Sequence, residues 1–260
     1  MKLAILATLI GSTAAFTASS FNGVGVQTSI RSSSSSTLKM ETIEDLEVLA
    51  LKLNPIVPAF DPLGLSRSNF WGSTQEETIG FIREAEIKHG RIAMFAFVGY
   101  LATANGWHFD WAMSLDGTPF PTTTNPPEAW DAIPDGGKLQ IFGFVGFLEF
   151  WREVNSEKHY MRGGKPGEFP DFDSTKIPGG ALNLYDPLGT ARKQTTEEKA
   201  NGLIKELNNG RAAMLGIIAF VSEAKIPGSV PLLKGLIQPY DGEIMAPLTK
   251  SILPHLPQFS

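Results

Sequence analysis

The chain carries the same short set of ionisable and amide side chains twice. Residues 86–94 read Glu-Ile-Lys-His-Gly-Arg-Ile-Ala-Met, and residues 206–214 read Glu-Leu-Asn-Asn-Gly-Arg-Ala-Ala-Met. Each copy leads into an apolar stretch, where ionisable side chains are costly and require partners. Because two copies of one costly arrangement can neutralise each other, the repeat predicts a metal-bearing ligand held between two paired helices.

The arginine of each copy is expected to find its partner in the other copy. In a helix, Arg91 lies five residues from Glu86, about 140° round the axis, which is too far for a good contact within one helix. We therefore predict two reciprocal ion pairs, Arg91 with Glu206 and Arg211 with Glu86, related by a local two-fold axis. Such pairs would keep both glutamates ionised inside an apolar environment.

Carboxylates paired in this way can still bind a metal ion. A glutamate neutralised by arginine keeps a free lone pair for a hard cation such as Mg²⁺. At one place in each copy, His89 offers an imidazole nitrogen and Asn209 an amide oxygen. A solvated magnesium site would instead cluster several carboxylates around the ion. Isolated ligands fit magnesium that a tetrapyrrole already holds, because that metal needs only one axial protein ligand.

Three helices are predicted to position these groups. The first covers residues 74–104 after a capping box at 73–76, and the third covers residues 196–224 after a capping box at 195–198. A middle helix is expected at 138–157, around the apolar residues 141–148. No alternating strand pattern is present, so the chain is predicted to be all-α.

The segments between and after these helices are predicted from their composition. Residues 116–137 and 163–189 are rich in Pro and Gly and are expected to be loops. A short amphipathic helix is a further candidate over residues 241–253.

The helices are interpreted as membrane spans. Their uncharged apolar runs are shorter than the roughly 20 residues of a bare span, and the alternative is a soluble three-helix protein. However, residues 92–104 and 212–221 leave no polar face for water, and the charges recur in matched opposite pairs. Gly90 and Gly210 would let the two backbones approach closely, as small residues do in membranes. We expect three transmembrane helices, the first and third crossed as a pseudo-two-fold pair.

The motif Glu-x-x-(His/Asn)-x-Arg in the first and third helices, each preceded by an Asp-Pro-Leu-Gly turn, resembles the light-harvesting chlorophyll-binding superfamily. The resemblance covers about residues 55–248. It implies that Arg91 and Arg211 lock the crossed helices. It implies chlorophyll magnesium ligands at Glu86, His89, Glu206 and Asn209. The two turns, which would shape the ends of carotenoid grooves, consist of Asp61, Pro62, Leu63 and Gly64, and of Asp186, Pro187, Leu188 and Gly189.

The resemblance adds three candidate ligands outside the repeat. Glu149 and Arg152 in the middle helix are similar to a family Glu-x-x-Arg, which makes Glu149 a further ligand. Gln140 is nine residues before Glu149, on the opposite face of that helix. The separation of these two residues is one residue longer than in the green-lineage members of the family. Glu223, near the end of the third helix, stands where many relatives carry Gln, and a surface carboxylate is the alternative interpretation.

The first 40 residues are interpreted as targeting sequence. Residues 1–15 have a basic start, an apolar run and a small-residue end, as in a signal peptide. Residues 16–40 are rich in Ser and Thr and contain no acid, as in a transit peptide. Together they resemble the bipartite address of plastids acquired by secondary endosymbiosis, with plain secretion as the alternative. Residues 41–260 would then be the chlorophyll-binding domain, in the thylakoid membrane.

This address and the short middle helix favour the red-lineage branch, the fucoxanthin chlorophyll a/c proteins. The resemblance implies chlorophyll a, chlorophyll c and fucoxanthin or related carotenoids as cofactors. It also implies a photosystem I or II core, other antenna subunits and thylakoid lipids as partners, and an oligomer. The expected function is a light-harvesting antenna, not an enzyme, with a photoprotective, energy-dissipating member as the alternative. A membrane enzyme or transporter is a remote alternative, since a di-iron bundle would repeat Glu-x-x-His and one copy here has Asn.

Composition excludes other classes. The chain has 22 Lys and Arg against 27 Asp and Glu, and three of the basic residues lie in the first 40. The remaining 19 against 27 leave a formal charge of −8, which argues against nucleic-acid binding. Cysteine is absent, so disulfides, thiolate catalysis and cysteine-ligated metals are excluded.

Overall fold

The computed structural model describes residues 41–56, 60–170 and 193–244, and this part of the chain is mostly helical. The helices are α2 (Ile43–Leu53), α3 (Gln75–Ala104), α4 (Pro126–Asp131), α5 (Asp135–Asn155) and α6 (Thr196–Lys225), with 3-10 turns at Leu65–Arg67, Phe70–Gly72, Tyr160–Arg162 and Pro231–Leu233. The only β pairing among the described residues is an isolated bridge between Ala112 and Pro119.

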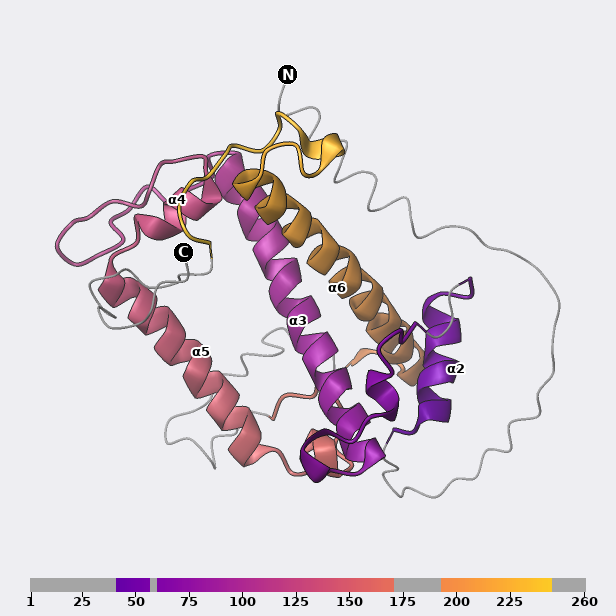
Figure 1. The fold of residues 1–260 in the computed structure, drawn as a ribbon. Coiled ribbons are helices and arrows are strands. Elements are labelled where there is room, and N and C mark those ends of the chain that lie inside the picture. Colours follow the sequence, from indigo (N-terminus) through magenta and orange to yellow (C-terminus); the bar gives the residue numbers. More distant parts are fainter. Residues whose placement is uncertain (1–40, 57–59, 171–192, 245–260) are drawn as a thin grey trace.

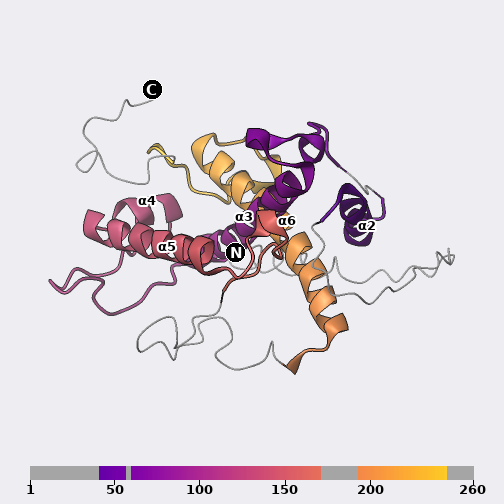
Figure 2. The ribbon, with the colours of Figure 1, turned by 90° about the horizontal axis from the view of Figure 1, so that it is seen from below.

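The two longest helices, α3 and α6, form the centre of the fold. They run side by side in the same direction (Figure 1) and cross when seen from below (Figure 2). Near their first halves, Ile87 and Leu207 share a buried cluster with Leu53 of α2. Near their ends, Tyr100 packs against Phe220, with ring centroids 5.0 Å apart. Helix α5 lies on the other side of α3, and among its residues only Lys138 and Arg152 are buried.

The α3–α6 crossing follows the sequence repeat. The buried positions Ile87, Gly90, Ala93 and Tyr100 of α3 correspond, 120 residues on, to Leu207, Gly210, Ala213 and Phe220 of α6, which are also buried. At the centre, a Cβ added to Gly90 would lie 3.1 Å from Gly210 Cα, and one added to Gly210 would lie 2.9 Å from Gly90 Cα. The two glycines therefore permit the close backbone approach that the sequence predicts.

The starts of the long helices are set by capping boxes. At α6 the box is the predicted one, with Thr195 as N-cap and Glu198 accepting from the Thr195 N–H at 2.8 Å. At α3 the predicted box is one residue too early, because Thr74 is the N-cap and pairs with Glu77. Ser73 is unavailable for this role since its N–H donates to Phe70 O at 2.9 Å and closes the preceding turn.

Other bounds differ from the prediction. Helix α5 begins at Asp135, three residues before the predicted start, because the carbonyl of Pro134 accepts from the N–H groups of Gly137 and Lys138. It ends at Asn155, where the Ser156 hydroxyl donates to Arg152 O at 2.6 Å. The prediction that residues 116–137 are all loop is wrong, since α4 lies there.

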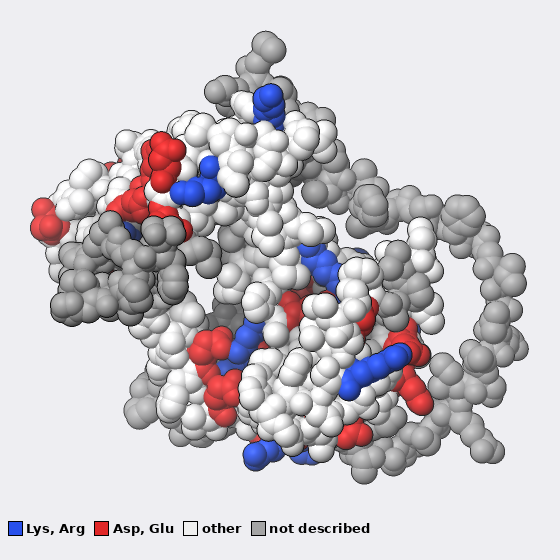
Figure 3. All heavy atoms as spheres, in the orientation of Figure 1, with Lys and Arg blue, Asp and Glu red and all other residues white. Residues whose placement is uncertain are grey.

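Charged side chains are absent from most of the second halves of α3 and α6, beyond the point where the two helices cross. Residues 92–104 of α3, 139–148 of α5 and 212–222 of α6 contain no charged residue. Figure 3 shows charge gathered towards one end of the molecule and beside α4, with an uncharged band between. Across the residues that the structure describes, none of the helices meets both the length and the hydropathy expected of a membrane span.

Several sequence predictions lie outside the described residues. These are the targeting segments 1–15 and 16–40 and the second turn, with Asp186, Pro187, Leu188 and Gly189. Of the expected amphipathic helix at 241–253, only residues 241–244 are described, and they are not helical.

Candidate functional site

Two reciprocal ion pairs join α3 and α6, as the repeat predicts. Arg91 Nε on α3 donates to Glu206 Oε1 on α6 at 2.5 Å. Arg211 Nε on α6 donates to Glu86 Oε1 on α3 at 2.7 Å. The two glutamate side chains are 21% and 28% exposed. Each carboxylate charge is thus neutralised by the opposite helix at the edge of the crossing.

The local two-fold symmetry fails at one residue. Arg83, one turn before Glu86, contacts Glu86 Oε2 and also lies 3.2 Å from a Glu41 oxygen. The equivalent position in α6 is Leu203, which cannot do this. Both oxygens of Glu86 are therefore bound by arginine, whereas Glu206 Oε2 accepts no hydrogen bond from the described part of the chain. The sequence repeat gave no sign of this difference, because Arg83 lies before the repeated residues.

The other two candidate ligands of the repeat are exposed. His89 is exposed, and its Nδ1 lies 2.7 Å from Ala85 O one turn earlier. Since a carbonyl can only accept, Nδ1 carries the hydrogen and the Nε2 lone pair remains for a metal. Asn209 is also exposed, and no described residue binds its amide group. Both side chains thus have a ligand atom on the outer surface of the crossed pair.

The candidate ligands outside the repeat differ in their surroundings. Gln140 and Glu149 are both exposed on α5, and their nine-residue separation puts them on opposite faces. Glu149 Oε2 contacts Lys88 Nζ of α3. Glu223 is buried, and its two oxygens accept from the N–H groups of Gly228 and Val230, both at 2.8 Å. Its carboxylate therefore closes the turn that follows α6.

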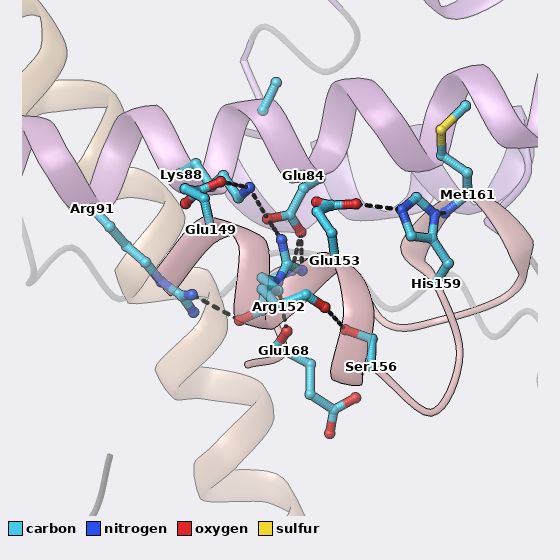
Figure 4. Close-up of polar contacts among 12 residues, drawn as sticks. Glu84, Lys88, Arg91, Glu149, Arg152, Glu153, Ser156, His159, Met161 and Glu168 are labelled. Atoms are coloured by element: carbon cyan, nitrogen blue, oxygen red, sulfur yellow. Dashed lines mark hydrogen bonds and ion pairs between the residues drawn. The ribbon is translucent and has the colours of Figure 1, made fainter. Parts of the chain in front are cut away.

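The most buried ion pair among the described residues was missed by sequence reasoning. Arg152 of α5 places both terminal nitrogens on the carboxylate of Glu84 in α3, with Nη2 2.6 Å from Oε2 (Figure 4). Arg152 Nε donates to Glu168 O at 2.9 Å, and the guanidinium carbon lies 5.2 Å from the Tyr160 ring centroid. The sequence drew attention to Arg152 only as a neighbour of Glu149. No local spacing links it to Glu84, 68 residues away.

One glycine connects this pair to the α3–α6 crossing. Gly167 N–H donates to Glu84 Oε2 at 2.7 Å, and Gly167 O accepts from Arg91 Nη1 at 2.7 Å. Its φ is +79°, and an added Cβ would lie 3.0 Å from the side chain of Ile87. Both the backbone conformation and the lack of space require glycine here. The loop after α5 is thereby fixed between the two ion-pair systems.

The first Asp-Pro-Leu-Gly turn is held by its aspartate. Asp61 accepts from the Ser66 hydroxyl at 2.6 Å and from the N–H groups of Leu65 and Ser66, both at 2.9 Å. These bonds, that of the Ser66 hydroxyl first, lower the pKa of Asp61. Gly64 supplies the left-handed residue of the turn, with φ +63°. Leu63 is left exposed on the outside.

The arrangement suits a metal that arrives inside a larger ligand. Within residues 41–56, 60–170 and 193–244, no group of three or more His, Cys, Asp or Glu side chains could hold a bare metal ion. The outward nitrogen of His89, the amide oxygen of Asn209 and the second oxygen of Glu206 are separate atoms, each with a lone pair that no described residue uses. Each can serve as a single axial ligand while the carboxylate charge stays balanced by arginine.

Comparison with known proteins identifies the family. A sequence model described as chlorophyll a-b binding protein matches residues 48–225. The chain is 35% identical to a chloroplastic fucoxanthin-chlorophyll a-c binding protein of Trieres chinensis, over 90% of this chain and 98% of that protein. It is 32% identical to fucoxanthin-chlorophyll a-c binding protein B of Phaeodactylum tricornutum, over 91% of this chain and all of the relative. The crossed, arginine-neutralised helices are thus those of a member of the chlorophyll a-b binding protein family, to which this chain belongs.

Proposed function

We propose that the protein is a light-harvesting antenna that binds chlorophyll a, chlorophyll c and fucoxanthin or a related carotenoid. Chlorophyll would supply light absorption and excitation transfer, and the polypeptide would supply rigid placement of each pigment. The observation that carries this proposal is the α3–α6 crossing, where glutamates balanced by arginine lie beside outward-facing His89 and Asn209. The names of its relatives support the pigment classes.

The proposed chlorophyll ligands fall into three groups. Glu86, His89, Glu206 and Asn209 are ligands of the crossed pair. Glu149 and Gln140 are ligands on the two faces of α5. Glu223 is the proposed ligand at the end of α6. Each of its oxygens accepts one backbone N–H, so it would bind magnesium through a second lone pair. The turns after Phe60 and Tyr185 are proposed as the ends of two carotenoid grooves.

We further propose that α3, α5 and α6 span the thylakoid membrane. Support comes from the large apolar side chains exposed on all three helices, including Phe95 on α3, Phe144 on α5 and Leu215 on α6. These side chains would be covered by pigment rings and by lipid. The ionisable side chains of the repeat that border these apolar stretches are paired, as is required for charges in a membrane. A photosystem I or II core, other antenna subunits and further copies of the chain are the proposed partners.

The test is refolding of the full chain with and without pigments. We expect a stable complex only when chlorophyll and carotenoid are both present, and light absorbed by the carotenoid should appear as chlorophyll fluorescence. A chain that folds equally well without pigments and retains none after purification would refute the proposal.

A further inference from the structure

The carboxylate of Glu149 on α5 lacks its expected neighbour. Arg152 is one helical turn further along, the spacing at which opposite charges normally pair. In the structure, however, Arg152 donates from Nη1 and Nη2 to the carboxylate of Glu84 and from Nε to Glu168 O. Arg152 is also buried, at 4% exposure. Turning it towards Glu149 would leave the buried carboxylate of Glu84 without a cation, which is strongly unfavourable.

Lys88 of α3 takes the place of that arginine. Its Nζ contacts Glu149 Oε2 and lies 3.9 Å from Glu84 Oε1, between the two carboxylates (Figure 4). No other cationic side chain of the described residues forms an ion pair with Glu149. Two carboxylates and two cations are thus balanced across the α3–α5 contact, each through a partner on the other helix.

The ammonium group of Lys88 has no lone pair and cannot bind magnesium itself, but it can balance the charge of a carboxylate that does. We propose that Lys88 is the positioning residue that allows Glu149 to bind chlorophyll magnesium on α5. The inference rests on the proposed pigment-binding function. A glutamate paired with Lys88 brings no net charge to the pigment, whereas an unpaired one would place a bare anion among apolar rings. The ligand on α5 would therefore depend on a side chain of the α3 repeat, directly next to His89.

The experiment uses the full chain refolded with chlorophyll and carotenoid. The variants are Lys88→Met, Lys88→Arg, Glu149→Leu and the double variant Lys88→Met/Glu149→Gln. Lys199→Met is the matched control, because Lys199 is an exposed lysine of α6 whose side chain has no ion-pair partner among the described residues. Chlorophyll per polypeptide is measured after extraction, and the visible circular dichroism of the complex is recorded.

Lys88→Met and Glu149→Leu should each lose about one chlorophyll per chain, because one axial ligand holds one magnesium. Lys88→Arg and the control should keep the wild-type content. The double variant should regain the lost chlorophyll and its dichroic band, since an amide oxygen can bind magnesium without a neighbouring cation. This rescue separates an electrostatic role of Lys88 from a merely structural one.

Two results would overturn the inference while leaving the antenna function intact. One is a wild-type chlorophyll content in Lys88→Met or in Glu149→Leu. The other is a double variant that binds no more chlorophyll than Lys88→Met alone. This comparison still tests the role of Lys88 if Lys88→Met yields little complex. Failure of the unmodified chain to bind chlorophyll would instead refute the proposed function itself.

Discussion

The broken symmetry of the crossing predicts unequal effects of two equivalent arginines. Arg91→Leu removes the one cation that, among the described residues, is bound to Glu206, and it removes the bond to Gly167 O. Arg211→Leu removes one cation from Glu86, which keeps Arg83. The first variant should therefore be clearly less stable than the second.

The magnitudes follow from exposure and bonding. Removing one partner of a fully buried pair costs about 3–5 kcal/mol, and of an exposed pair less than about 1 kcal/mol. The Arg91 and Glu206 side chains are 34% and 28% exposed, so we expect an intermediate cost. About 2 kcal/mol for the pair and about 1 kcal/mol for the bond to Gly167 give about 3 kcal/mol. For Arg211, which is 45% exposed and leaves Glu86 paired, about 1 kcal/mol is expected.

The assay is denaturant unfolding of the pigment complex at fixed pigment concentration, because bound ligands contribute to stability. Loss of energy transfer from carotenoid to chlorophyll reports unfolding. The double variant Arg83→Leu/Arg211→Leu is the internal control. It strips Glu86 of both cations and also removes the Arg83–Glu41 pair, so its stability should fall at least to the level of Arg91→Leu. Equal losses in the two single variants, or a larger one in Arg211→Leu, would refute the reasoning.

Three further outcomes are expected. His89→Leu should lose about one chlorophyll per chain, by pigment extraction, while the helix crossing survives, because one axial ligand holds one magnesium. Gly210→Ala should cost about 2 kcal/mol of unfolding free energy, as in other overpacked contacts, because its Cβ would meet Gly90 Cα at 2.9 Å. Burial, followed by the hydrogen bond to Asp131, raises the pKa of Tyr240 to about 12. Because the folded pKa is raised, its stabilising contribution should be complete below pH 10 and disappear as pH rises towards 12.

Each of these outcomes has a direct check. An unchanged chlorophyll count in His89→Leu removes that residue from the ligand set. An unchanged unfolding free energy in Gly210→Ala would mean that the two helices can move apart at Gly90 and Gly210 without loss of stability. For Tyr240, the tyrosinate absorbance of the Tyr240→Phe variant is subtracted from that of the wild type, and a midpoint near the usual value of 10.0 would contradict the burial argument.

The crossing could be predicted from sequence because its cause is local and repeated. An arginine five residues from its own glutamate must find another partner, and the second copy of the repeat supplies one. The small residues Gly90 and Gly210 indicate where the backbones meet, and this too is visible in the sequence. The same reasoning fails for Glu84 and Arg152, because Arg152 has a nearer carboxylate one turn away and only the folded loop brings Glu84 to it.

The missed helices have equally specific causes. Helix α4 starts with two prolines, which suggest a loop, yet proline suits the first turn of a helix because its missing N–H is not needed there. Helix α2 starts at a capping box in which Asp45 stands where Glu is usual, so the expected Glu or Gln signal is absent. In each case the residues at the helix start are compatible with a helix, but they are not the residues most often found there.

The central claim is that arginine-balanced side chains of the repeat bind chlorophyll magnesium at the α3–α6 crossing. The most direct test is an experimental structure of the pigment-loaded complex. We expect a tetrapyrrole with its magnesium about 2.1 Å from Glu206 Oε2, and another at His89 Nε2, with Arg91 still paired to Glu206. A complex whose chlorophylls all lie on other residues, with Glu206 and His89 covered only by protein or lipid, would contradict the account.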